Sequence, residues 1–349
     1  MKLISTLKNY VLNSFCVKIC EIYNKGESFY MEKETILVIG AGTMGASIAQ
    51  VFSANGYRTY MSCRHAEHLN DAVARIDKAI DGLIAEGMAK EEYRKAVHAN
   101  LICLTVDKIP EIASKIDVAV ETIAESPKAK KDLYQMLNDN CREDCIFCSN
   151  TSGMDVFSVS KGVIKHQENL IITHWFNPPH LMKLVEVVRG TLTSDATTEK
   201  MCALLKTVGK KPAVLNHFAP GFIVNRLATV IMRELYYMIG QGWISAEDAD
   251  NALRYTNGLR WGFEGPVALW DFVGLDIPMT VAKGGVLASL CNDTDTLPYG
   301  EKLLAEGKKG VKTGEGALKW GNADVYVAKR NRRIIQMSKI MDEWDKEDA

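Results

Sequence analysis

Residues 36–56 read ILVIGAGTMGASIAQVFSANG, and this stretch decides the fold. A β-branched run leads into three glycines spaced G-x-G-x-x-G, and a helix pattern follows that closes on Gly56. A strand that turns into a helix through such glycines points free N–H groups at a pyrophosphate. A glycine turn that binds no ligand is the alternative. The motif favours a dinucleotide site at Gly40, Gly42, Thr43, Met44 and Gly45.

Strand-like runs separated by helical stretches continue along the chain, at 36–40, 59–62, 101–105, 117–123, 145–149, 169–173, 183–188 and 211–215. This alternation predicts an α/β fold of the Rossmann type, with a doubly wound and mainly parallel sheet. After Pro220 apolar residues recur at helical spacing instead. We therefore expect a dinucleotide-binding domain over 34–214, with a helical hairpin inserted at 66–98, and a helical domain over 215–349.

The composition narrows the classes of partner. The 349 residues are 47% hydrophobic and 24% charged, with a net charge of −1, which gives no electrostatic attraction to nucleic acid or an anionic membrane. No apolar run is long enough to span a bilayer. Nine cysteines show no disulfide framework, and the C-x2-C at Cys145 lacks a second ligand pair, so we expect free thiols and no metal. The expected partners are small molecules and protein subunits, in the cytoplasm.

Residues 1–33 are interpreted as an N-terminal extension. Apolar residues recur there at helical spacing with lysines between them. The segment shows neither the compact apolar region nor the small-residue cleavage site of a secretory signal. A secretory signal is therefore not expected. Two interpretations stay open, namely that the native chain starts at Met31 or that the segment is a poorly ordered amphipathic extension.

The stretch THWFNPPHLMKLVEVV (173–188) predicts an acid–base pair. His174 follows a buried strand run, at the sheet edge where ligands of open α/β sheets bind. Glu186 lies inside an apolar run, where an unpaired carboxylate costs several kcal/mol, so His174 is its expected partner. Such a carboxylate fixes the ring tautomer while the other ring nitrogen takes a proton. The alternative is a packed histidine and a solvent-facing glutamate.

Other polar residues follow strands at the same predicted edge. Asn150 and Ser152 come after CIFC, and Glu125 comes after the strand that ends near Ile123. Asn225 lies early in the first helix of the second domain, within PGFIVNR. Each of these residues could be an ordinary cap or loop contact. Their convergence on one crevice favours a functional site.

Four motifs in order, GAGTMGASIA, SNTS, HWFNP with LVEVV, and PGFIVNR, resemble the 3-hydroxyacyl-CoA dehydrogenase family from residue 34 onward, and KTGEGALKW (312–320) looks like a degenerate form of its glycine-rich signature. The resemblance implies an NAD-dependent oxidoreductase of fatty acid metabolism. Its substrate would be a short-chain 3-hydroxyacyl-CoA, such as 3-hydroxybutyryl-CoA. The helical domain would carry part of the substrate site and form a homodimer.

The resemblance also implies roles for single residues. His174 would be the catalytic base and Glu186 its orienting carboxylate, while Ser152 and Asn225 would bind the substrate oxygen. Four further residues would contact the cofactor, the first two near the nicotinamide ribose: Glu125, Lys130, Asn150 and Asn177.

Three departures from the family pattern bear on specificity. Cys63 and Arg64 stand where an acid usually binds the adenosine ribose of NAD, and Arg64 suits a 2′-phosphate, which favours NADP(H) over NAD(H) unless Arg64 is merely solvated. Pro179-His180 resembles relatives that oxidise free hydroxy acids such as carnitine or gulonate. The hairpin at 66–98 holds five Lys or Arg against seven Asp or Glu, a poor cradle for the phosphates of CoA. A dehydrogenase of a free 3-hydroxy acid, or a non-catalytic nucleotide-binding protein, is the alternative.

Overall fold

The computed structural model describes residues 33–347, so the predictions for the N-terminal extension lie almost wholly outside the described residues. From Thr35 onward the described chain forms one compact unit. None of the described helices is long and apolar enough to cross a bilayer.

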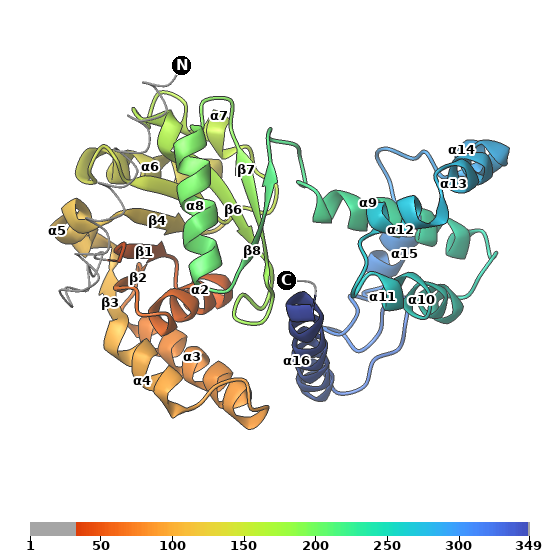
Figure 1. Ribbon diagram of the computed structural model, residues 1–349, viewed down its shortest axis with the longest axis horizontal. Coiled ribbons are helices and arrows are strands. Elements are labelled where there is room, and N and C mark those ends of the chain that lie inside the picture. The colour runs from red at the N-terminus through yellow and green to blue at the C-terminus, as the bar shows by residue number, and fades with distance from the viewer. Residues whose placement is uncertain (1–32, 348–349) are drawn as a thin grey trace, which may run out of the picture. The chain divides into compact units, whose positions relative to one another are not determined.

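Eight strands form one sheet in the order β3-β2-β1-β4-β5-β6-β7-β8 (Figure 1). The strands are β1 (Ile36–Ile39), β2 (Thr59–Cys63), β3 (Leu101–Thr105), β4 (Val118–Glu121), β5 (Ile146–Ser149), β6 (Leu170–Trp175), β7 (Leu184–Arg189) and β8 (Lys211–Leu215). All neighbours pair in parallel except β6 and β7, which are antiparallel. The predicted Rossmann-type sheet and its eight strand runs are confirmed.

Helices cover both faces of the sheet because alternate strand residues point to opposite sides. Ile36 and Val38 belong to the core under one set of helices, and Leu37 and Ile39 to the core under the other. The first set is α2 (Thr43–Ala54), α3 (Glu67–Ala85), α4 (Glu91–Asn100) and α8 (Asp195–Thr207). The second set is α5 (Ile109–Ile112), α6 (Pro127–Asn140) and α7 (Val156–Ser160).

Two helices, α3 and α4, lie side by side in Figure 1 within the range 66–98 where the sequence predicts an inserted hairpin. The chain turns between them at Gly87, whose φ of 67° lies in the region that favours glycine. Leu69, Ile76 and Ile80 on α3 are buried, so the hairpin packs onto the sheet domain through one apolar stripe.

The described residues after Leu215 contain no strand, in line with the predicted helical part. Its helices are α9 (Val224–Gly240), α10 (Ala246–Arg254), α11 (Asn257–Arg260), α12 (Pro266–Val273), α13 (Asp276–Val281), α14 (Leu287–Ser289), α15 (Pro298–Ala305) and α16 (Ala323–Glu347). The division into domains at residue 215 stays a prediction.

The last helix, α16, contacts the hairpin, which the sequence did not indicate. Ile335 is buried in a small apolar cluster with Leu83 of α3 and Leu181. The Arg332 guanidinium lies 2.8 Å from the Glu86 carboxylate, and the Lys339 ammonium donates to the Glu86 carbonyl at 2.7 Å. The negative charge of Glu86, at the turn of the hairpin, is therefore paired with Arg332 of α16.

Candidate active site

The antiparallel register of β6 and β7 brings His174 and Glu186 together. The two residues are directly opposite each other in the sheet. Nδ1 of His174 lies 2.7 Å from Oε2 of Glu186, and both side chains are buried. Assigning the proton to Nδ1, which donates to the carboxylate, leaves Nε2 as the acceptor. The arrangement is that of a general base.

Glu186 is also bonded to the start of α9. Its second oxygen, Oε1, accepts the backbone N–H groups of Ile223 and Val224 at 3.0 and 2.9 Å. The preceding residue, Phe222, is buried with φ of 53°, a strained conformation for a non-glycine residue and one found most often at functional sites. This backbone bend aims the helix N-terminus at the carboxylate.

These hydrogen bonds decide the charge of Glu186. Burial opposes its ionisation, but the His174 ring and the two backbone amides hold the pKa of Glu186 below its usual value. The rings of Phe176 and Phe222 lie 4.6 and 5.3 Å from the His174 ring. An ionised carboxylate in this apolar setting would stabilise an imidazolium at His174.

The loop after β5 carries two of the predicted site residues, and one of them contacts a third, on α9. Asn150 uses Oδ1 to accept the Trp175 backbone N–H at 2.8 Å, which ties the loop to the strand of His174. Ser152 is exposed, and its carbonyl accepts the Asn225 side-chain amide at 3.1 Å. The structure thus brings Ser152 and Asn225 together, as both roles require.

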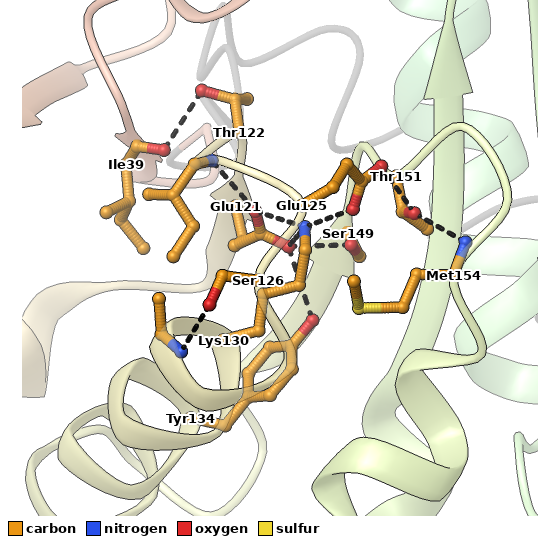
Figure 2. A network of polar contacts seen from close by, with 12 residues as sticks. Ile39, Glu121, Thr122, Glu125, Ser126, Lys130, Tyr134, Ser149, Thr151 and Met154 are labelled. Carbon is orange, nitrogen blue, oxygen red and sulfur yellow. Dashed lines mark hydrogen bonds and ion pairs between the residues drawn. The ribbon is translucent and has the colours of Figure 1, made fainter.

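Glu125 and Lys130 lie in a network that Figure 2 shows. Glu125 accepts the Thr151 hydroxyl at 2.7 Å and the Ser152 N–H at 2.8 Å. Lys130 is only 1% exposed and donates to both oxygens of Glu121 at 2.7 Å. Sequence reasoning missed Glu121, although the argument used for Glu186 applies to it, because it too lies inside an apolar strand.

The glycine-rich loop has the shape that a pyrophosphate needs. Gly40 has φ of 112° and passes so close to Thr122 that a Cβ would lie 2.5 Å from its Oγ1. A Cβ on Gly45 would lie 1.7 Å from the Gly40 carbonyl oxygen, whereas one on Gly42, before α2, would meet no atom within 4 Å. The helix therefore starts close to the strand and leaves open space at Gly42, so these residues fit a dinucleotide.

The end of β2 opens into a cavity of about 860 Å³ beside this loop. Cys63 lines it, and its thiol donates to the His65 carbonyl at 3.0 Å. Arg64 and His68 also line it. The cavity further includes the acids Asp71 and Asp132.

The loop between β6 and β7 leaves Asn177 exposed, so its predicted cofactor contact stays a prediction. His180 in this loop bonds through Nδ1 to the Ser47 hydroxyl of α2 at 2.9 Å. Burial, and then the charge of Lys210, lower the pKa of His180 from 6.5 to about 4. A neutral imidazole thus bonds the loop between β6 and β7 to α2, the helix that follows the glycine-rich loop.

This depressed pKa predicts acid sensitivity. Between pH 6.5 and 4, His180 binds a proton in the unfolded chain but not in the folded protein. The contribution of neutral His180 to the free energy of unfolding is therefore fully present above pH 6.5 and is lost as the pH falls towards 4. We expect this loss to be about 3 kcal/mol. His180→Gln should flatten the pH dependence of urea unfolding over this interval, and exposed His217→Gln should not. Parallel curves for His180→Gln and the unaltered protein would contradict it.

Comparison with known proteins places these features in one family. Residues 35–218 match the 3-hydroxyacyl-CoA dehydrogenase NAD binding domain, and residues 221–320 match the C-terminal domain of the same family. The mitochondrial hydroxyacyl-coenzyme A dehydrogenase of Sus scrofa is 34% identical, with 82% of this chain and 90% of that protein covered.

Two solved structures are similar. The NAD⁺-dependent dismutase 5-formyl-3-hydroxy-2-methylpyridine 4-carboxylic acid 5-dehydrogenase is 27% identical with a TM-score of 0.79, over 88% of this chain and 98% of that one. (S)-3-hydroxybutyryl-CoA dehydrogenase from Ralstonia eutropha is 29% identical with a TM-score of 0.68, over 82% of this chain and 99% of that one.

Proposed function

Because this chain belongs to the 3-hydroxyacyl-CoA dehydrogenase family, we propose that it interconverts a short-chain 3-hydroxyacyl-CoA and its 3-oxoacyl-CoA. The substrate class is that of 3-hydroxybutyryl-CoA. The observation that carries the proposal is the buried contact of 2.7 Å between His174 and Glu186.

The proposed roles are those that the family resemblance implies, and the contact between His174 and Glu186 supports the first two. In oxidation, Nε2 of His174 takes the proton of the 3-hydroxyl group, and in reduction it returns that proton. Glu186 holds the ring tautomer and stabilises the imidazolium. Ser152 and Asn225 bind the substrate oxygen. The glycine loop holds the dinucleotide, whose nicotinamide supplies or accepts the hydride at C3 of the substrate.

The runner-up is a dehydrogenase of a free 3-hydroxy acid of the carnitine or gulonate type. Arg94 of the hairpin is held by three acids, Asp77, Asp81 and Glu91, and is not available to a CoA phosphate. Glu86 is bonded to Arg332 and Lys339 of α16, a helix that lies beyond the residues matched by the family. The pyridine carboxylic acid dehydrogenase, whose named substrate has no CoA, also aligns with more of this chain than the CoA enzyme does.

Turnover of matched substrates separates the two candidates. Acetoacetyl-CoA should be reduced with a kcat/KM at least about tenfold above that of free acetoacetate or dehydrocarnitine, about 1.4 kcal/mol of transition-state preference. Each should be assayed with both NADH and NADPH. Turnover of a free acid without turnover of the thioester would replace the proposal by the runner-up. Cofactor binding with no turnover of any of them would favour the non-catalytic alternative.

The family match indicates NAD as the cofactor, and we propose that this chain prefers NADP(H). Arg64 lines the cavity at the end of β2, where a cysteine that bonds to the His65 carbonyl stands at residue 63 in place of an acid. Cys63→Asp combined with Arg64→Gln should move the preference towards NAD(H), as measured by kcat/KM with NADPH and NADH. An unaltered enzyme at least about tenfold better with NADH would refute the preference.

We also propose a homodimer that includes α9. No side chain of α9 is buried within this chain, and Leu227 and Val230 are each 53% exposed. Exposed apolar patches of this kind mark subunit contacts. Light scattering should give about twice 38.8 kDa. Leu227→Glu with Val230→Glu should give the single mass, whereas Leu192→Glu, at an exposed site in a loop of the sheet domain, should not. A monomeric unaltered protein at micromolar concentration would refute the dimer.

The cytoplasm is the proposed location. The seven cysteines of the described chain are free, which is consistent with a reducing compartment.

A further inference from the structure

A buried charged network lies beside the proposed site and has no part in the proton transfer. Glu121, at the end of β4, and Lys130, on α6, are each 1% exposed. Both side chains are thus shielded from solvent, and the cofactor contact that the family resemblance implies for Lys130 stays a prediction. Replacing a buried ion pair by apolar residues is often neutral or stabilising, so stability alone is a weak reason for this pair.

Both carboxylate oxygens of Glu121 accept hydrogen bonds from neighbouring groups (Figure 2). Its Oε1 accepts the Ile123 N–H at 2.8 Å, and its Oε2 accepts the hydroxyl groups of Ser149 at 2.7 Å and Tyr134 at 3.4 Å. Both oxygens also accept from the Lys130 ammonium at 2.7 Å. Glu121 thereby fixes the position of Lys130 at the start of α6.

Lys130 also forms an ion pair with Glu125 and thereby restricts the position of that side chain. Its Nζ lies 3.3 Å from Oε2 of Glu125, whose side chain is 45% exposed. The other oxygen, Oε1, accepts the Thr151 hydroxyl and the Ser152 N–H. The Ser152 carbonyl in turn accepts the Asn225 amide. A continuous series of contacts therefore connects Glu121 at the end of β4 with Ser152 and Asn225, the two proposed substrate-binding residues.

We propose that Glu121 and Lys130 are positioning residues, which lock Glu125 and through it the loop that places Ser152 and Asn225 at the substrate oxygen. The inference rests on the proposed function, because it takes the roles of Ser152 and Asn225 from there. Without Lys130, Glu125 turns to solvent and the Ser152 N–H loses its acceptor.

The test removes both charges while keeping the approximate volume of the two side chains. Glu121→Gln with Lys130→Met takes out one charge of each sign, so urea unfolding should stay closer to the unaltered protein than for Glu121→Gln alone. The double variant should nevertheless lose about tenfold to a hundredfold in kcat, because small misplacements of binding groups are costly. The matched control is Lys108→Met with Glu111→Gln, an exposed ion pair at the start of α5 that does not line the cavity, which should leave kcat unchanged.

Two further readouts separate positioning from general loss of structure. Amide hydrogen exchange at residues 152–154 should be at least about tenfold faster in the double variant. The kcat loss should shrink in a Ser152→Ala background, since the group being placed is then absent. An equal loss in both backgrounds, or normal kcat with normal exchange, would overturn the proposal.

Glu125→Gln provides the same test should the double variant not fold, because this side chain is half-exposed. It should reproduce both the loss of kcat and the faster exchange, and normal values of both would refute the inference. If the unaltered chain turns over none of the substrates, the proposed function fails. The exchange measurement then still decides whether Glu121 and Lys130 hold the loop.

Discussion

A His174→Gln variant is expected to lose about 10²-fold or more of kcat while it binds the dinucleotide as the unaltered protein does. General acid–base catalysis contributes 10²–10⁴, and glutamine supplies no group that takes up a proton. The buried ring of His174 bonds to Glu186, not to the glycine loop, so cofactor affinity should be spared. Steady-state turnover and NADH fluorescence titration measure the two effects. Near-normal turnover would end the assignment of His174 as the base.

The companion variant, Glu186→Gln, should also lower kcat, through loss of tautomer control and of imidazolium stabilisation. The two substitutions should not be additive, since a carboxylate that acts through the ring has no effect once the ring is gone. A double variant that loses the product of the two single effects would show that Glu186 acts separately. His217→Gln, at an exposed position, is the surface control.

The second large effect is expected from Gly45→Ala. The added methyl group would lie 1.7 Å from the Gly40 carbonyl oxygen and 2.6 Å from the Thr122 hydroxyl, so α2 must move away from β1. We expect a loss of at least about 3 kcal/mol in the free energy of unfolding, at the upper end of the cost of overpacking. Dinucleotide affinity should fall with it, because the helix N-terminus no longer meets the pyrophosphate.

Two glycines serve as controls for this prediction. Gly82→Ala, inside α3 with no atom within 4 Å of the new Cβ, should be neutral or stabilising by up to about 1 kcal/mol. Gly42→Ala should unfold like the unaltered protein but bind NADH more weakly, since only the ligand needs that space. Urea unfolding and NADH titration measure both quantities. A Gly45→Ala protein as stable as Gly82→Ala would contradict the packing argument.

Much of this molecule follows from its sequence because the signals are local. The strands are short runs rich in apolar residues, and the hairpin turns where Glu86-Gly87 interrupts a helical pattern. The pairing of His174 with Glu186 was also predictable, since a carboxylate inside an apolar strand requires a partner. The same argument, had it been applied to Glu121, would have predicted a cation beside it.

Other features depend on three-dimensional packing. The start of α6 reads PKAKK, with three lysines that all resemble solvated residues. Only the orientation of the helix shows that Lys130 points inward while Lys128 is 87% exposed. The contact of α16 with Glu86 joins residues far apart in the chain, and no periodicity within either segment indicates it.

The antiparallel pairing of β6 and β7 has a consequence for how such a protein can change. His174 and Glu186 face each other through the antiparallel register of β6 and β7, and the segment 176–183 connects the two strands. A change in the length or sequence of that segment that preserves this register leaves His174 and Glu186 opposite each other. Under the proposed function, substrate preference can diverge in this connecting segment while the proton transfer proposed for His174 is retained. Grafting the corresponding loop of a relative is accordingly a direct way to redesign what this scaffold accepts.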